Sequence, residues 1–284
     1  MKTTLLHTFR SFSALLFVLA VALSAVRLDA GVEVYPLSLF INAPNRTASV
    51  SISNPTDTRQ EIWVEYKFGY PVANDSGKFE MHYVEPPYTG ELSAVSWLKA
   101  FPQRFVLNPK ESQLVRIMVS APANLTPAEY WARIVVSSTT REVKKVVAPG
   151  GAPAARFQYI SQIDIPLHYR FGSVTAGLTV KDVSSRTDTG NLVLSINLTH
   201  SGNASYWGTM TATLKNQSGK VFMTQNDVVA IYKDMHYPAT YSVKSVPPGT
   251  YTLELAFTTK RHGLASQFTL RSEPVKYSTS IVLP

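Results

Sequence analysis

The 284-residue chain contains no cysteine, so it can form neither a disulfide nor a metal site with thiolate ligands. Charged residues are also few, at 16% of the sequence, and the formal net charge of +8 contains no basic cluster longer than a pair such as Lys144-Lys145. A nucleic-acid-binding protein usually concentrates its positive charge on one patch. We therefore expect no nucleic-acid partner, and a fold that is held together by hydrophobic cores alone.

The sequence also lacks an apolar run long enough to cross a bilayer. Its longest run, Ala14–Leu23, follows a basic start at Lys2 and is much shorter than the roughly 20 residues that a membrane-spanning helix needs. A basic start, a short apolar run and small residues in that order are typical of a secretory signal. We predict that residues 1–30 form a signal peptide cleaved after Ala25 or Ala30, and that the exported protein is soluble and does not span a membrane.

Sequence motifs of catalysis are missing as well. The six histidines show no metal-ligand spacing, and the chain has neither a Gly-x-Ser-x-Gly elbow nor a phosphate-binding loop. We therefore expect no enzyme activity, no cofactor, no metal ion and no small-molecule substrate.

What the sequence does contain is alternation with a period of two. Apolar residues alternate with polar ones in Ala48–Ser53, in Leu192–Leu198 and in Tyr251–Phe257. Turn residues such as Asn54-Pro55 and Pro247-Pro248-Gly249 separate these stretches. Alternation with one apolar face indicates antiparallel sheets that are packed on one side, so we predict an all-β protein.

The pattern divides near Phe171-Gly172-Ser173, where one long strand ends and a new alternation begins. We predict two tandem immunoglobulin-like β-sandwich domains of about seven strands each, at residues 31–171 and 172–284. Two connections, residues 69–95 and 139–156, interrupt the rhythm and are expected to be long loops. Loops of this length are usually functional or disordered.

The segment Phe157–Phe171 is the most informative strand. One of its faces carries Phe157, Tyr159, Ser161, Ile163 and Ile165. A strand of about 15 residues exceeds the usual five or six, so part of it could overhang the sheet and invite strand addition from another chain. Pro166 removes one hydrogen-bond donor, which also favours an edge. The alternative is an ordinary core strand whose ends are covered by the preceding loop.

Five segments in the right order resemble the periplasmic chaperones of pilus and fimbria assembly, the PapD-like family. They are Val32–Pro36, Ala48–Pro55, Phe105–Ile117, Glu129–Ser138 and Ile165–Phe171. Segments Asn197–Asn203 and Pro248–Leu255 of the second domain look like family strands and turns to a lesser degree.

The resemblance implies a mechanism and partners. A chaperone of this family binds pilin-like subunits in the periplasm by lending each of them a strand, and delivers them to an outer-membrane usher. The client-binding residues at matching positions are Phe157, Tyr159, Ser161, Ile163 and Ile165. The family also implies a salt bridge between Glu129 and Arg170 that joins the two domains.

One departure from the family concerns the two basic residues that anchor the client's terminal carboxylate. Ser38 and Pro166 occupy those positions here, and neither supplies a cation. The anchor has moved, or the client is bound differently, or the protein is a relative with another task. Arg170 shares a face with Pro166 and could substitute, although its match to the interdomain arginine favours the structural role. The alternative function is a structural or adhesive β-sandwich of the cell envelope that is not a chaperone.

Overall fold

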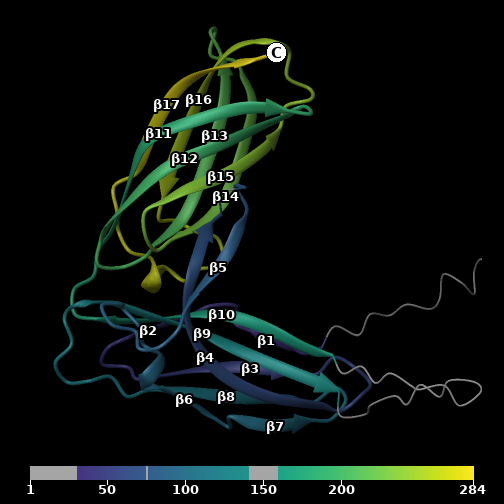
Figure 1. Ribbon diagram of the computed structural model, residues 1–284, viewed down its shortest axis with the longest axis vertical. Helices are drawn as coiled ribbons and strands as arrows, with labels where there is room; N and C mark the ends of the chain where they lie inside the picture. Colours follow the sequence, from purple (N-terminus) through teal and green to yellow (C-terminus); the bar gives the residue numbers. More distant parts are fainter. Residues whose placement is uncertain (1–30, 75, 141–158) are drawn as a thin grey trace, which may run out of the picture.

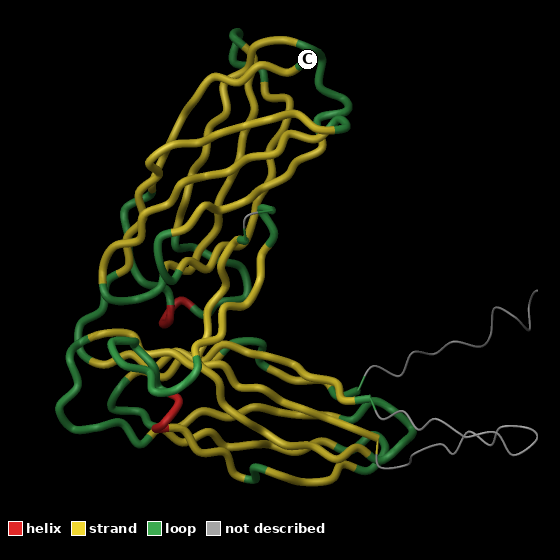
Figure 2. Tube along the Cα trace, viewed as in Figure 1, coloured by secondary structure: helices red, strands yellow, loops and turns green. Residues whose placement is uncertain are grey.

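The computed structural model describes residues 31–74, 76–140 and 159–284 (Figure 1). The predicted signal segment and most of the predicted 139–156 loop lie outside these residues. The predicted fold class is confirmed: the chain forms β-sandwiches, and the helices of the described residues are the short 3₁₀ turns η1 (Val95–Trp97) and η3 (Ser266–Phe268). The two sandwiches meet at an angle, which gives the molecule a bent shape (Figure 2).

The first sandwich packs a four-stranded sheet against a larger one. The order of the smaller sheet is β1 (Glu33–Tyr35), β3 (Thr47–Ser53), β8 (Ser112–Val119) and β6 (Leu98–Phe101). The order of the larger sheet is β2 (Leu39–Asn42), β10 (Ile160–Phe171), β9 (Ala128–Thr140), β4 (Gln60–Ala73) and β5 (Phe79–Val84), with β7 (Arg104–Leu107) also paired to β4. The inward residues of both sheets, such as Ile52, Ile117 and Leu167, are fully buried in one core.

The second sandwich contains the remaining seven strands. One sheet has the order β11 (Ala176–Asp188), β12 (Asn191–Gly202) and β15 (Met235–Ser242). The other has the order β14 (Val221–Ile231), β13 (Tyr206–Asn216), β16 (Gly249–Thr258) and β17 (Val275–Leu283). Between the sandwiches the chain turns at Gly172, whose φ is +67° and whose position would bring a Cβ within 2.8 Å of Pro127. Glycine suits both constraints.

The expectation of an unstructured loop over residues 69–95 is wrong for its first half. Strand β4 continues to Ala73, and β5 pairs with it from Phe79 to Val84. The hairpin turn is closed by hydrogen bonds at Asn74, whose carbonyl accepts from the Gly77 amide at 2.8 Å. Gly69 and Pro71 in β4 obscured the alternation in the sequence. The hairpin extends beyond its own sandwich toward the second one (Figure 1), where Phe79 packs edge-on against Tyr237.

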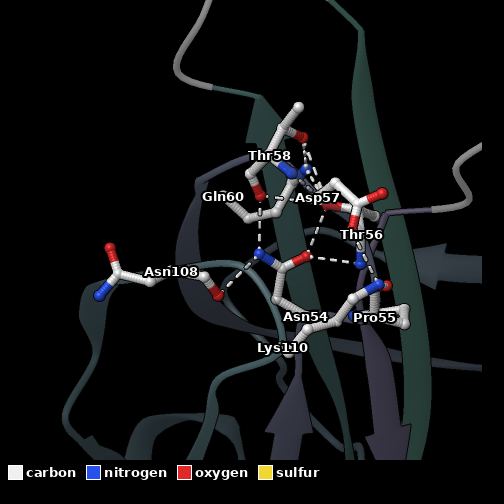
Figure 3. Close-up of polar contacts among 8 residues, drawn as sticks. All are labelled: Asn54, Pro55, Thr56, Asp57, Thr58, Gln60, Asn108 and Lys110. Carbon is white, nitrogen blue, oxygen red and sulfur yellow. Dashed lines mark hydrogen bonds and ion pairs between the residues drawn. The ribbon is translucent and has the colours of Figure 1, made fainter.

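A buried asparagine fixes the turn between β3 and β4. Asn54 is 1% exposed, and its Nδ2 donates to the carbonyls of Thr58 at 2.7 Å and Asn108 at 3.0 Å. Its Oδ1 accepts from the Thr56 hydroxyl at 2.7 Å and from the Thr56 amide at 3.1 Å (Figure 3). One side chain thus joins two loops that are about fifty residues apart in sequence.

Replacing Asn54 by alanine should destabilise the protein by about 2–3 kcal/mol, because buried amide and carbonyl groups would lose their partners. Urea unfolding provides the measurement, with Asn108→Ala as the matched control. The Asn108 side chain is exposed, and only its backbone carbonyl takes part in the cluster. Equal unfolding free energies for the two variants would contradict this account of the turn.

Candidate functional site

Strand β10 has a free edge along its first half. It pairs antiparallel with β9 over its whole length, from Ile160 to Phe171. On its other side, β2 pairs with it in parallel only from Leu167 to Arg170. Among the described strands, nothing pairs with that second side between Ile160 and Pro166. Unpaired amides and carbonyls on such an edge form a template for a strand from another chain.

The predicted row of client-binding side chains changes from exposed to buried along this edge. Tyr159, just before β10, is 84% exposed, Ser161 is exposed, and Ile163 is half-buried against the first core. Ile165 is 1% exposed and lies in the core, so the exposed part of the row ends before it. The opposite sheet covers the row progressively toward the domain junction. Phe157 lies outside the described residues.

The predicted length of this strand also needs correction. Regular pairing begins at Ile160 rather than at Phe157, and the strand contains 12 residues rather than about 15. Ile160, on the opposite face from Tyr159, is 55% exposed. Tyr159 and Ile160 therefore present large apolar side chains on opposite faces.

The structure brings the two departures from the family together. Because Leu39 pairs with Leu167 at the start of the parallel ladder, Ser38 and Pro166 lie one residue before that first pair on their respective strands. Pro166 is buried opposite Arg133, and Ser38 is partly buried at the entrance of β2. The two side chains are therefore a hydroxyl and a pyrrolidine ring, and the neighbouring Arg133 is already paired with Asp164 at 2.5 Å.

The centre of the domain junction is the carboxylate of Glu129. It is 0% exposed and accepts from Arg170 Nε at 2.7 Å through Oε2. Its Oε1 lies 2.9 Å from His168 Nδ1 and accepts from the Ser205 amide at 3.1 Å and from the Ser205 hydroxyl. Glu129 and Arg170 belong to the first sandwich and Ser205 to the second, so one carboxylate connects both.

Protonation follows from this environment. Burial by itself would raise the pKa of Glu129, but His168 above all, followed by the charge of Arg170 and the hydrogen bond from Ser205, holds this pKa well below its usual range. Burial lowers the pKa of His168, which is therefore neutral at pH 7. Neutral His168 donates from Nδ1 to Glu129, and its Nε2 accepts from the Tyr232 hydroxyl at 3.2 Å.

The cationic partner also reaches into the second sandwich. Arg170 Nη1 donates to the Phe268 carbonyl at 2.6 Å, and its guanidinium carbon lies 4.9 Å from the Phe40 ring centre. Around this pair packs an aromatic cluster from both sandwiches, which includes Phe40, Phe68, Tyr70, Trp131, Trp207 and Tyr232. The junction is thus a small core of its own with a charged centre.

A serine, a histidine and a carboxylate in contact invite comparison with a hydrolase triad. The geometry does not support that chemistry, because the Ser205 hydroxyl donates to Glu129 and not to His168. A nucleophilic serine needs the histidine as its base and access to substrate. Ser205, His168 and Glu129 are all buried, so the arrangement is a structural contact between domains.

Sequence reasoning named Glu129 and Arg170 but missed their other partners. The sequence pattern predicts no role for His168, for Ser205 or for the Phe268 carbonyl. His168 faces the same side of β10 as Arg170, and this shared face was a signal that could have identified it. No local pattern marks Ser205 or Phe268, because their role depends on how the second sandwich docks.

Within the described ranges, the structure has no group of three or more His, Asp or Glu side chains that could hold a metal ion. Nor does that part of the chain contain a helix long and apolar enough to span a membrane.

Neither a protein-family model nor a curated protein matches the sequence. Several solved structures, in contrast, are similar to this chain. The chain is similar to the Salmonella enterica SafB chaperone in complex with the SafA pilin, with 16% identity, coverage of 90% of this chain and 99% of that one, and a TM-score of 0.40. It is also similar to the CsuC–CsuE chaperone–tip adhesion subunit complex of Acinetobacter baumannii, with 13% identity, coverage of 87% and 98%, and a TM-score of 0.40.

A third similar structure is the YadV chaperone, with 10% identity, coverage of 89% and 100%, and a TM-score of 0.41. The chain is therefore similar to chaperones of surface fibres over most of its length, but at low identity and low TM-score.

Replacing Arg170 by alanine should destabilise the protein by about 3–5 kcal/mol, because it leaves the buried Glu129 carboxylate without its cation. Urea unfolding measures the loss. Arg186→Ala is the control, because both side chains of the Arg186–Asp188 pair are exposed to solvent. No measurable change in the free energy of unfolding is expected for this variant. An Arg170→Ala variant as stable as Arg186→Ala would show that the junction does not depend on this pair.

Acidification should weaken the junction in two steps. The folded pKa of His168 lies below the ordinary value of 6.5, so its contribution to stability is complete above pH 6.5 and is lost as the pH falls below it. The groups that set this response are Glu129, Arg170, Arg133 and Tyr232. Glu129 adds a second loss only below its ordinary value of 4.5.

Unfolding free energies between pH 7.5 and 5.5 test the first step. As the pH falls, the wild type should lose up to about 1.4 kcal/mol of unfolding free energy per pH unit because of His168. The variant His168→Gln should lack this pH dependence. The exposed His236 provides the control variant, His236→Gln, which should keep it. A slope that survives in His168→Gln would assign the pH dependence to other groups.

Proposed function

We propose that this protein is a periplasmic chaperone that binds pilin-like subunits by strand addition at the free edge of β10. The observation that supports it is the unpaired side of β10 from Ile160 to Pro166, next to a row of inward-facing side chains that becomes exposed toward Tyr159. The chaperone then delivers its client to an outer-membrane usher, as the family resemblance implies.

Physical chemistry supports this use of the edge. A client strand laid beside Ile160–Pro166 would satisfy the free amides and carbonyls of β10 and extend the large sheet into the client. On the inner face, Tyr159, Ser161 and Ile163 lie where the sandwich's own core thins out. Those side chains would enter the client's core, and each large apolar side chain buried there contributes about 1.5–3 kcal/mol.

The burial of Ile165 limits how many side chains the edge can donate to a client. Since Ile165 already belongs to the chaperone's own core, it anchors the donated strand rather than filling a client pocket. Recognition therefore depends on the exposed start of the strand. Phe157 remains part of the proposal, although it lies outside the described residues.

The experiment is co-expression with a pilin-like subunit, followed by purification of the chaperone from the periplasm. A Tyr159→Asp, Ser161→Asp double variant should recover at least about tenfold less subunit, because it would force two charges into the client's core. Both side chains are exposed, so the variant should fold normally.

Leu114→Asp is the matched control, because Leu114 is 62% exposed on β8 of the other sheet. It should leave subunit recovery unchanged. If the folded double variant recovered as much subunit as Leu114→Asp does, strand donation at β10 would be excluded.

A further inference from the structure

The β4–β5 hairpin leaves the large sheet and rises toward the second sandwich (Figure 1). Strand β4 pairs with β9 only as far as Lys67, and β5 pairs with β4 from Phe68 onward. The tip of the hairpin contacts the second sandwich, where the ring centres of Phe79 and Tyr237 lie 5.0 Å apart. Its base makes a further contact, which reaches back to strand β10.

Tyr83 of β5 makes this contact at the base. Its hydroxyl donates to Oδ2 of Asp164, which lies in the unpaired half of β10. The other carboxylate oxygen, Oδ1, accepts from Arg133 Nε at 2.5 Å. Burial, followed by the hydrogen bond and the charge of Asp164, raises the pKa of Tyr83 to about 12, so the phenol remains a donor at neutral pH. Two other strands, β5 and β9, thus hold the one carboxylate of β10.

A glycine in β4 leaves room for this tyrosine. Gly69 lies directly opposite Tyr83 in the β4–β5 ladder. A Cβ at Gly69 would lie 2.8 Å from Cδ1 of Tyr83 and 2.8 Å from the His82 carbonyl oxygen, which is closer than real contacts allow. Glycine inside a strand weakens it and often marks the close approach of another group. The group that approaches here is the Tyr83 ring, so Gly69 permits the position from which Tyr83 reaches β10.

Asp164 lies in the part of β10 that has the least support. From Ile160 to Pro166 the strand pairs with β9 alone among the described strands. A strand held on one side opens more easily than one held on both, because fewer hydrogen bonds must break. Alternate residues of a strand point to opposite faces, so Asp164 lies on the face opposite Ile163 and Ile165. Its contacts therefore hold the strand while the inner face and the free edge stay open.

We infer that Tyr83 is a positioning residue for this edge: through Asp164 it keeps the unpaired half of β10 extended and paired with β9. A client strand then meets a preformed edge, and less ordering entropy is lost on binding. The benefit to a client rests on the proposed function, whereas the ordering of the edge is a property of the free protein. A role confined to the hairpin would affect β5 and leave β10 unchanged.

Hydrogen–deuterium exchange of the full chain measures the order of the edge. Tyr83→Phe removes the hydroxyl and keeps the ring. The amides of residues 160–165 should exchange about tenfold faster in this variant, because a hydrogen bond to a charged group is lost. Those of β8 in the other sheet should keep their rates. Tyr35→Phe is the matched control, because this tyrosine is 76% exposed on β1, and it should exchange as the wild type does.

A double-mutant cycle tests whether Tyr83 acts through Asp164. Asp164→Ala should speed exchange in residues 160–165 at least as much as Tyr83→Phe does, because it also leaves Arg133 without its carboxylate. Adding Tyr83→Phe to Asp164→Ala should produce no further change, since the partner of the hydroxyl is already gone. Additive effects of the two substitutions would show that Tyr83 does not act through this carboxylate.

Subunit recovery in the co-expression experiment separates this role from the proposed function. Tyr83→Phe should recover at least about threefold less subunit than Tyr35→Phe, because the edge must become ordered on binding. Equal recovery in these two variants, while the Tyr159→Asp, Ser161→Asp variant loses its subunit, would overturn the positioning role and keep strand donation. Unchanged exchange in residues 160–165, or faster exchange confined to β5, would also overturn it.

Faster exchange in Tyr83→Phe, together with full recovery in the Tyr159→Asp, Ser161→Asp variant, would have the opposite meaning. It would keep Tyr83 as the residue that orders this edge and would remove strand donation.

Discussion

The Glu129 carboxylate is the point on which the arrangement of the two sandwiches depends. It is fully buried, yet it remains ionised because a guanidinium, an imidazole and a serine surround it. Those partners come from both domains, so the charge is satisfied only when the sandwiches are docked. A buried ion pair often adds little net stability, but separating it is costly. The polar contacts of Glu129 therefore fix the orientation of the two sandwiches, and the surrounding aromatic cluster stabilises the junction.

That docking and the proposed client-binding edge share one strand of the first sandwich. Strand β10 contributes His168 and Arg170 to the junction through its last residues, while its first residues form the free edge. One strand thus connects the domain interface to the proposed client-binding edge. The same docking brings the loop of Arg261 opposite β2 and so creates a cleft between them.

Several features of the site could be predicted from the sequence for local reasons. The period-two pattern of β10 identified the face that carries Tyr159, Ser161 and Ile163, because alternate residues of any strand point the same way. The same pattern could not tell that Ile165 is buried and Tyr159 exposed, since burial depends on how far the opposite sheet extends. The β4–β5 hairpin was missed because Gly69, Pro71 and the turn at Asn74 resemble a loop when read locally.

The sequence by itself determined an all-β chain without disulfides, the strand alternation of both halves and the pairing candidates Glu129 and Arg170. The first two follow from residue type and spacing, which act over a few neighbours, whereas the pair was implied by the resemblance to the PapD-like family. Only the tertiary structure decided that β2 covers just the second half of β10 and that Ser205 and Phe268 complete the junction. Each of these depends on which distant segments meet, and such contacts are set by the packing of whole sheets rather than by local pattern.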